Sequence, residues 1–196
     1  IGCNICYAHN SRGAAIRCTQ NPTMGEEWRS GWHPEKVPTR HADESVLIVG
    51  GGPAGLEAAR TLGERGYTVT LAEAGTELGG RVAKESKLPG LSEWARVRDH
   101  RLQQFTKLPN LALYLESPMT PADILATGAD HVAIATGADW RRDGVGLTHA
   151  APITTSMPAE QIFTPDDIMA GRMPEGRVLV FDDDGFYMAS LLAEKL

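Results

Sequence analysis

Residues 45–73 read SVLIVGGGPAGLEAARTLGERGYTVTLAE, and this stretch decides the fold of the chain. The apolar run Val46–Val49 is suited to a buried parallel strand, and the alanine- and leucine-rich run after the glycines predicts a helix. Gly66 ends that helix, and Thr68–Ala72 is expected to form a second strand. We therefore expect an α/β fold, with a Rossmann-like parallel sheet flanked by helices.

The first strand-to-helix turn carries the pattern G-x-G-x-x-G. Gly50 permits the tight turn, Gly52 lets the backbone approach a pyrophosphate, and Gly55 lets the helix lie close to the strand. Pro53 is near the first helical position, where its missing N–H costs nothing. The free N–H groups of this helix N-terminus, with Ala54 in its first turn, favour phosphate oxygens.

Glu73 follows the second strand of this unit. A carboxylate at that point accepts hydrogen bonds from both ribose hydroxyls and repels a 2′-phosphate. Strand, glycines, helix, second strand and acid occur in the order that an adenine-nucleotide site needs. We expect ADP, or the ADP half of FAD, as the ligand. The alternative is a structural βαβ unit whose glycines only turn the chain.

A second glycine-containing segment, TELGGRV, begins at Thr76. Paired glycines let a second loop approach the phosphates, and a following arginine adds positive charge. Its spacing from Glu73 is similar to the E-x-x-x-x-L-G-G segment of disulfide-reductase-type flavoproteins. The further cofactor-binding residues expected here are Ala74, Leu78, Gly79, Gly80 and Arg81. The alternative is an ordinary glycine turn with a surface arginine.

The net charge of −6 and the isoelectric point near 5.5 argue against nucleic acid as a partner. No run of about eighteen apolar residues predicts a membrane span, and no signal-peptide pattern opens the chain, so we expect a cytoplasmic protein. The chain starts at Ile1 without a methionine and stops at Leu196 inside an expected helix. We therefore expect it to be part of a longer polypeptide.

All three cysteines, Cys3, Cys6 and Cys18, lie near the start of the chain. Their odd number and the lack of a secretory signal make a disulfide framework a poor explanation. In C-x-x-C two thiolates grip one centre, and the third cysteine adds a distal ligand. Zinc and iron–sulfur clusters both accept such thiolates. The alternative is a set of plain buried or reactive thiols.

Three segments that begin at Ile1, Cys18 and Gly25 read IGCNIC, CTQNPT and GEEWRSGWHPE. They resemble the iron–sulfur flavoprotein amine dehydrogenases, which are the trimethylamine, dimethylamine and histamine dehydrogenases, related to the old yellow enzyme group of NADH:flavin oxidoreductases. In that family the cysteine pattern starts one cysteine earlier, as C-I-G-C-x-x-C. The resemblance implies a 4Fe-4S cluster held by Cys3, Cys6, Cys18 and a cysteine immediately before Ile1, so the ligand set is incomplete here.

The resemblance also implies an N-terminal (β/α)8 barrel that holds FMN and oxidises a small amine. That barrel is outside this chain, so no residue here is expected to be catalytic. Electrons would pass through the cluster to an acceptor like an electron-transferring flavoprotein, and the intact protein would be a homo-oligomer. By the same resemblance, the Ala-Thr-Gly loop with Thr136 and Gly137 passes near the nucleotide. On composition alone this loop is only a turn.

Two other functions fit the motifs. One is a reductase of the dienoyl-CoA type, with FAD at the glycine turn and NADPH in the next domain. The other is a non-enzymatic adenine-nucleotide-binding module with structural zinc. For NADPH the relevant segment is Asp182-Asp183-Asp184-Gly185, which follows an expected strand over Arg177–Phe181. Three acids stand there in place of a glycine fingerprint, so we expect that NADH and NADPH are not used.

The domain organisation expected from these motifs has four parts. They are an iron–sulfur loop segment and linker (1–44), a dinucleotide-binding half-domain (45–139), a linker (140–175) and the start of a second nucleotide-binding-like domain (176–196). Within the half-domain the pattern predicts a helix over 91–108, strands over 110–116 and 131–135, and a short helix capped by Thr120. Thr164 is expected to cap another short helix, and a last helix is expected over 187–196.

Overall fold

The computed structural model describes residues 5–21, 23–29, 37–40, 43–153, 156–183 and 185–196. The chain divides into two compact units. The first comprises Ile1–Ala83 and Glu93–Gly137, and the second comprises Lys84–Ser92 and Ala138–Leu196. The finer four-part division expected from the sequence stays a prediction.

The first unit contains a four-stranded parallel sheet with the strand order β3-β2-β1-β4. The strands are β1 (Ser45–Val49), β2 (Thr68–Ala72), β3 (Leu111–Tyr114) and β4 (His131–Ile134). The α/β class and the parallel sheet predicted from the sequence are confirmed. Because all four strands are parallel, their carboxyl ends meet at one edge of the sheet, where ligands bind in folds of this kind.

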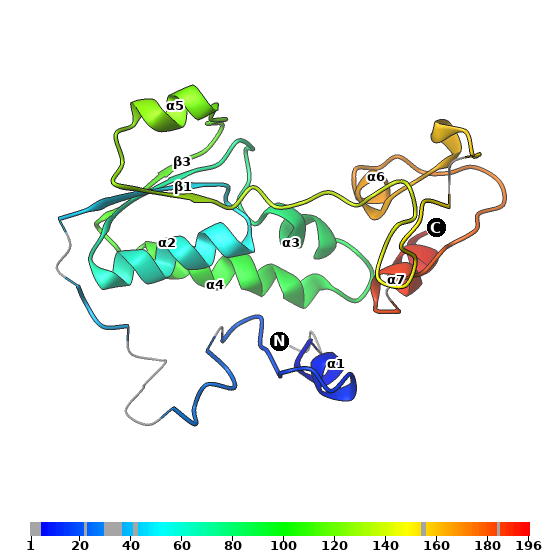
Figure 1. The fold of residues 1–196 in the computed structure, drawn as a ribbon, viewed down its shortest axis with the longest axis horizontal. Coiled ribbons are helices and arrows are strands. Elements are labelled where there is room, and N and C mark those ends of the chain that lie inside the picture. The colour runs from blue at the N-terminus through cyan, green and yellow to red at the C-terminus, as the bar shows by residue number, and fades with distance from the viewer. Residues whose placement is uncertain (1–4, 22, 30–36, 41–42, 154–155, 184) are drawn as a thin grey trace. The chain divides into compact units, whose positions relative to one another are not determined.

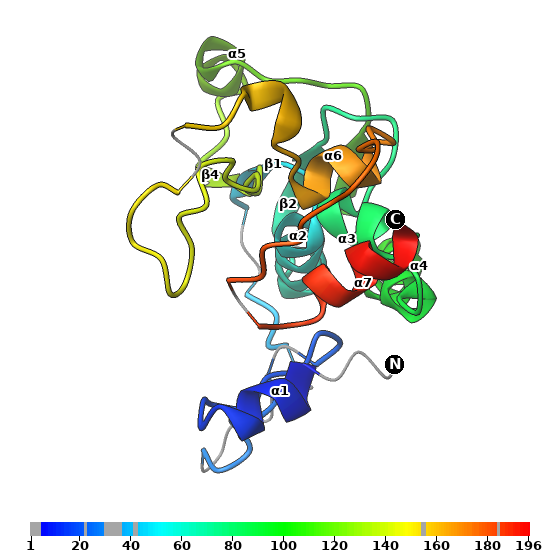
Figure 2. The ribbon, with the colours of Figure 1, turned by 90° about the vertical axis from the view of Figure 1, so that its right-hand side faces the viewer.

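Helices cover both faces of this sheet. They are α2 (Pro53–Arg65), α4 (Ala95–Phe105, after a 3₁₀ turn over Ser92–Trp94) and α5 (Pro121–Ala126). A further helix, α3 (Gly80–Glu85), begins in the second glycine-containing segment. Figures 1 and 2 show α2 and α5 on opposite sides of the strands, with α4 beside α2. The sheet is therefore the middle layer of three.

Alternating residues of β1 supply the two halves of the core. Val46 and Ile48 pack with Leu56 of α2, and Leu102 and Phe105 of α4 pack against the same cluster. Leu47 and Val49 point to the other face, against the segment that carries α5. Because β1 is buried on both faces, its sequence is a continuous apolar run rather than an alternating one.

The ends of several helices carry the capping residues expected from the sequence. Gly66 follows α2 in the left-handed conformation with φ of +97°, as expected for its C-terminal glycine. Thr120 caps α5 and Thr164 caps α6 (Pro165–Met169), each in a capping box with the aspartate three residues on. Both caps confirm the expectation from the sequence. Two helices were not expected, α3 and α1 (Ile5–Ser11).

The second unit has a small core of its own. Leu88, Ile168, Met188 and Leu192 form a buried cluster, to which α6 and α7 (Met188–Lys195) contribute; a 3₁₀ turn lies at Ala159–Gln161. The strand expected over Arg177–Phe181 is wrong: these residues have no regular secondary structure and no strand pairing, and Leu179 is 92% exposed. A strand needs a hydrogen-bonded neighbour, and none adjoins this segment within the described chain.

No helix among the residues that the structure describes has the length and apolar character needed to cross a bilayer.

Candidate nucleotide-binding site

The turn between β1 and α2 is tightly closed. Gly50 has φ of +108°, and its N–H donates to the carbonyl of Ala72, at 2.8 Å. A Cβ atom at Gly50 would clash with the carbonyl of Ala135, and one at Gly55 would clash with the carbonyl of Gly50. These two positions therefore admit only glycine, because the atoms in the way belong to the backbone and have no freedom to rotate aside.

Gly52 has a different environment. It precedes α2 with φ of −74° and ψ of −179°, makes no side-chain cap, and would accept a Cβ without any neighbour within 4 Å. Pro53 begins the helix, and Ala54 follows in its first turn. Space is thus left open at the positive end of a 13-residue helix, where an anion is stabilised by the dipole and by N–H groups.

The carboxylate of Glu73 joins two loops. Its Oε2 accepts a hydrogen bond from the N–H of Gly51, at 2.6 Å, and its Oε1 accepts one from the N–H of Gly75, at 2.7 Å. Each oxygen keeps a further lone pair for an incoming hydroxyl. From the sequence, Glu73 was expected only to contact the ribose. Its hydrogen bond to Gly51 joins residues 22 positions apart, so no local sequence pattern predicts this bond.

The second glycine loop lies against the first. The N–H of Gly79 donates to the carbonyl of Gly51 at 2.8 Å, and the buried side chain of Leu78 fills the space beside Gly51. A Cβ at Gly80 would lie 3.0 Å from Cα of Gly52. Only glycine at this position therefore allows the start of α3 to come so close to the open end of α2. Arg81 follows in the first turn of α3 and is half-buried, whereas Ala74 is exposed.

The Ala-Thr-Gly loop after β4 completes the group. The N–H of Ala135 donates to the carbonyl of Val49 at 2.7 Å, and the nitrogen of Thr136 would lie 3.0 Å from a Cβ at Gly50. Gly137 has φ of +78°. The structure thus brings the three glycine-containing segments together at the carboxyl ends of β1, β2 and β4.

For the predicted cluster site, the structure describes two of the three cysteines. Cys6 is exposed in α1, and Cys18 is partly buried, with the N–H of Gln20 3.4 Å from its sulfur; Cys3 lies outside the described residues. Over the described ranges, no group of three His, Cys, Asp or Glu side chains is arranged to hold a metal ion. The described residues therefore do not test the cluster, and the metal site stays a prediction from the sequence.

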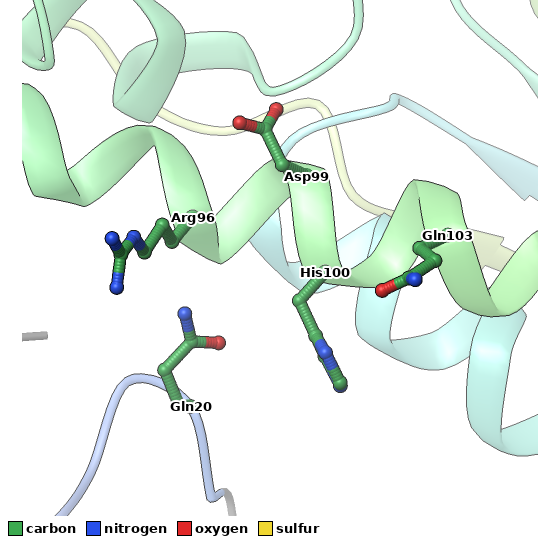
Figure 3. Close-up of a pocket in the computed structure, with 5 residues that line it drawn as sticks. All are labelled: Gln20, Arg96, Asp99, His100 and Gln103. Carbon is green, nitrogen blue, oxygen red and sulfur yellow. The ribbon is translucent and has the colours of Figure 1, made fainter.

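A polar pocket lies between α4 and the Cys18 segment (Figure 3). Its lining residues are Gln20, Arg96, Asp99, His100 and Gln103. In Figure 3, Arg96 and His100 extend from α4 toward the side where Gln20 lies, whereas Asp99 points away. The lining side chains include both signs of charge and come chiefly from one helix, which does not resemble the glycine-lined cradle that a nucleotide needs.

In the second unit, the acidic run is engaged with a loop rather than with a helix. Asp183 accepts hydrogen bonds from Thr148, through the N–H at 2.9 Å and through the hydroxyl, and it lies 3.0 Å from Nδ1 of His149. The hydrogen bonds from Thr148 lower the pKa of Asp183 to about 2. Asp182 accepts from the N–H of Gly185. Neither carboxylate caps the following helix, because α7 starts only at Met188 and has no side-chain cap; Asp184 lies outside the described residues.

Comparison with known proteins agrees with the fold of the first unit. Residues 48–116 match the family model of an NAD(P)-binding Rossmann-like domain. The match contains the first glycine turn, Glu73 and the second glycine loop. The fold and the matched residues therefore define the first unit as a Rossmann-like domain of the nucleotide-binding class.

The whole chain matches a narrower group. It is 45% identical to the dimethylamine dehydrogenase of Hyphomicrobium sp. (strain x), covering 100% of this chain and 28% of that protein. It is 52% identical to two solved structures. One is the 6-hydroxypseudooxynicotine amine oxidase of Pseudomonas geniculata N1, with TM-score 0.91 over 100% of this chain and 29% of the other. The other is the histamine dehydrogenase of Rhizobium sp. 4-9, with TM-score 0.87 over 98% and 28%.

This chain is thus homologous to a segment of the amine dehydrogenase family, which confirms the resemblance seen in its sequence motifs. It spans between a quarter and a third of the length of these relatives, which are named as two dehydrogenases and an amine oxidase. The predicted class, part of an amine dehydrogenase-type oxidoreductase, agrees with this match.

Proposed function

We propose that this chain is the nucleotide-binding and electron-transfer part of an iron–sulfur flavoprotein that oxidises a small amine by N-demethylation or deamination. The similarity of nearly this whole chain to a segment of dimethylamine and histamine dehydrogenases supports this class of reaction. The amine and FMN would bind in a barrel outside this chain. No residue of the present chain is therefore assigned to the chemical step, and its contribution is to bind a nucleotide and to relay electrons.

The observation that carries the proposal is the cradle at the carboxyl edge of the sheet. The open space at Gly52, the close approach of Gly80 and the dipole of α2 together suit a pyrophosphate. Glu73, at the end of β2, suits a ribose. The residues proposed to line the nucleotide are Gly50, Gly52, Pro53, Ala54, Gly55, Glu73, Ala74, Leu78, Gly79, Gly80, Arg81, Thr136 and Gly137.

The nucleotide is proposed to be ADP or the ADP part of FAD, without a 2′-phosphate. The acidic side chain of Glu73 would lie beside the ribose, and it would repel a 2′-phosphate at that position because both groups are negatively charged. Calorimetric titration of the chain with ADP and with 2′-phospho-ADP tests this. We expect ADP to bind about tenfold more tightly or better, which corresponds to about 1.4 kcal/mol. Equal or reversed affinities would remove Glu73 from this role.

Cys3, Cys6, Cys18 and one ligand from outside the chain are proposed to hold a 4Fe-4S cluster. Such a cluster supplies single-electron transfer when bound. Iron and acid-labile sulfide analysis of the intact protein distinguishes it from structural zinc: about four irons and four sulfides per polypeptide are expected, and stoichiometric zinc without sulfide would exclude the cluster.

The acceptor is proposed to be a separate protein like an electron-transferring flavoprotein, rather than NAD⁺ or NADP⁺. The second unit offers Asp182 and Asp183 where a dinucleotide site would need glycines, and both carboxylates are occupied with their own loops. Stopped-flow mixing of the oxidised intact protein with NADH or NADPH should give no rapid flavin reduction. Rapid reduction by either would favour the dienoyl-CoA reductase type. A cytoplasmic location and a homo-oligomeric state complete the proposal.

A further inference from the structure

Arg98 of α4 reaches across to the second glycine loop. Its Nη1 lies 2.6 Å from Oε1 of Glu77, and its Nε lies 2.8 Å from the carboxylate of the adjacent Asp99. The side chain is only 21% exposed, although Glu77 itself is 53% exposed. The structure therefore turns this arginine toward the glycine loop rather than toward solvent.

The aliphatic stem of Arg98 also touches the loop directly. A Cβ at Gly79 would lie 2.9 Å from Cδ of Arg98, and Gly79 has φ of +107°, so a side chain is excluded there both by space and by backbone conformation. The stem thus fills the place that a side chain of residue 79 would take. It supports the peptide whose N–H donates to the carbonyl of Gly51.

We propose that Arg98 is a positioning residue for the nucleotide. Its ion pair with Glu77 and its contact with Gly79 hold residues 77–79 against Gly51, and this sets how closely Gly80 approaches Gly52. The distance between those two glycines fixes the width of the opening that would receive the pyrophosphate. The inference rests on the proposed nucleotide site but adds a residue that has no contact with the ligand.

Arg96, two positions earlier on the same helix, provides a matched control. Its Nε lies 2.9 Å from Glu93 in an ion pair within the same segment, and its side chain is 63% exposed. It has the same chemistry as Arg98 but lacks the link to the glycine loop. Removing its charge therefore reports on helix α4 alone.

The test compares Arg98→Met, which keeps an unbranched apolar stem, with Arg96→Met. ADP affinity is measured by calorimetry, and hydrogen exchange is followed at the amides of residues 77–80. Arg98→Met is expected to weaken ADP binding about five- to twentyfold and to speed exchange in the loop, whereas Arg96→Met changes affinity less than twofold. The reversed pair Arg98→Glu with Glu77→Arg is expected to recover affinity within about threefold of wild type, which a merely structural role would not predict.

Wild-type affinity and wild-type exchange in Arg98→Met would overturn the inference while leaving the nucleotide site in place. If the wild-type chain itself fails to bind ADP, the proposed function fails, and the exchange measurement still decides whether Arg98 holds the loop. Should Arg98→Met not fold, Glu77→Gln removes the same ion pair from its exposed side, and the same two measurements apply.

Discussion

Arg101 of α4 pairs with Glu57 of α2, with Nε 2.8 Å from Oε2 and only 4% of the arginine side chain exposed. The same guanidinium donates to the carbonyl of Val97 at 2.7 Å and reaches the carbonyl of Thr19 at 3.4 Å. A single buried cation thus joins three parts of the first unit: the helix that follows the glycine turn, the helix α4, and the segment directly after Cys18.

The first prediction concerns this cation. Arg101→Leu should destabilise the folded state by about 1–3 kcal/mol, because Glu57 and the backbone carbonyls lose a charged donor inside the protein. The Cys18 thiol should also react faster with an alkylating reagent, since the adjacent segment loses its tie to α4. Urea unfolding and timed alkylation with mass spectrometry provide the measurements. Arg96→Leu, at an exposed ion pair, should change both by little; unchanged stability and reactivity in Arg101→Leu would contradict the prediction.

The second prediction separates folding from binding at the glycine turn. Gly50→Ala should cost about 2–5 kcal/mol of folding free energy, because its φ of +108° is unfavourable for alanine and the new methyl meets the Ala135 carbonyl. Gly52→Ala should fold with nearly wild-type stability, since its φ is ordinary and the Cβ meets nothing. It should nevertheless lose ADP affinity at least tenfold, as its methyl would occupy the space of the pyrophosphate. Thermal unfolding measures the stability of both variants, and calorimetry measures their ADP affinity. Tight ADP binding by Gly52→Ala would show that the phosphates do not lie beside residue 52.

The third prediction concerns Glu73. An amide side chain in Glu73→Gln keeps one acceptor oxygen but turns an NH₂ group toward one of two N–H donors, those of Gly51 and Gly75. Exchange of one of these two amides should therefore rise, and the preference for ADP over 2′-phospho-ADP should shrink. Hydrogen exchange and paired titrations check both effects. Retained discrimination together with loosened loops would assign Glu73 to architecture only.

The fourth prediction uses pH. The hydrogen bonds from Thr148 lower the pKa of Asp183 to about 2, from an ordinary value of 3.8. Because the folded-state pKa lies below the unfolded one, the stability that Asp183 contributes is fully present above about pH 4 and is lost as the pH falls toward 2. Thr148→Val should raise this pKa toward its ordinary value and weaken the acid dependence in that window. Carbon-detected NMR titration of the carboxyl group is the measurement, and an unshifted pKa in the variant would disprove the assignment.

The pKa of Glu57 is also lowered in the folded protein, so its contribution to stability should likewise decrease in acid. Burial acts to raise its pKa, but the hydrogen bond from Arg60 and the charges of Arg101 and Arg60 outweigh this and lower the pKa below its ordinary value. The contribution of Glu57 to stability is therefore present above about pH 4.5 and declines below it.

The sequence predicted those parts of the fold whose causes are local. The strand over Val46–Val49, the helix that ends at Gly66 and the caps at Thr120 and Thr164 each depend on residues within one or two turns, and the structure has all of them. The strand over Arg177–Phe181 failed because an apolar run specifies a strand only when another strand pairs with it.

The detailed geometry of the site depends on long-range contacts that the spacing of residues in the sequence does not predict. The glycines of the three loops were recognisable, because their spacing along the sequence matches known nucleotide-binding patterns. The ties between the loops were not: Glu73 to Gly51, Arg98 to Glu77 and Arg101 to Thr19 join residues that are 21 or more positions apart. Tertiary packing separates the exposed Arg96 from the inward Arg98 and Arg101, and the residue type alone does not distinguish these three arginines of α4.

The double anchor made by Glu73 bears on how such a domain changes its cofactor. In many nucleotide-binding domains the acid at the end of the second strand is the simplest residue to exchange when a preference for phosphorylated ribose is wanted. Here the same two oxygens also hold the turns at Gly51 and Gly75. A substitution that removed the negative charge would loosen the loops at the same time. The preference for the ligand and the shape of the loops thus depend on the same side chain. A redesign that removes the charge of Glu73 must first replace its hydrogen bonds to Gly51 and Gly75.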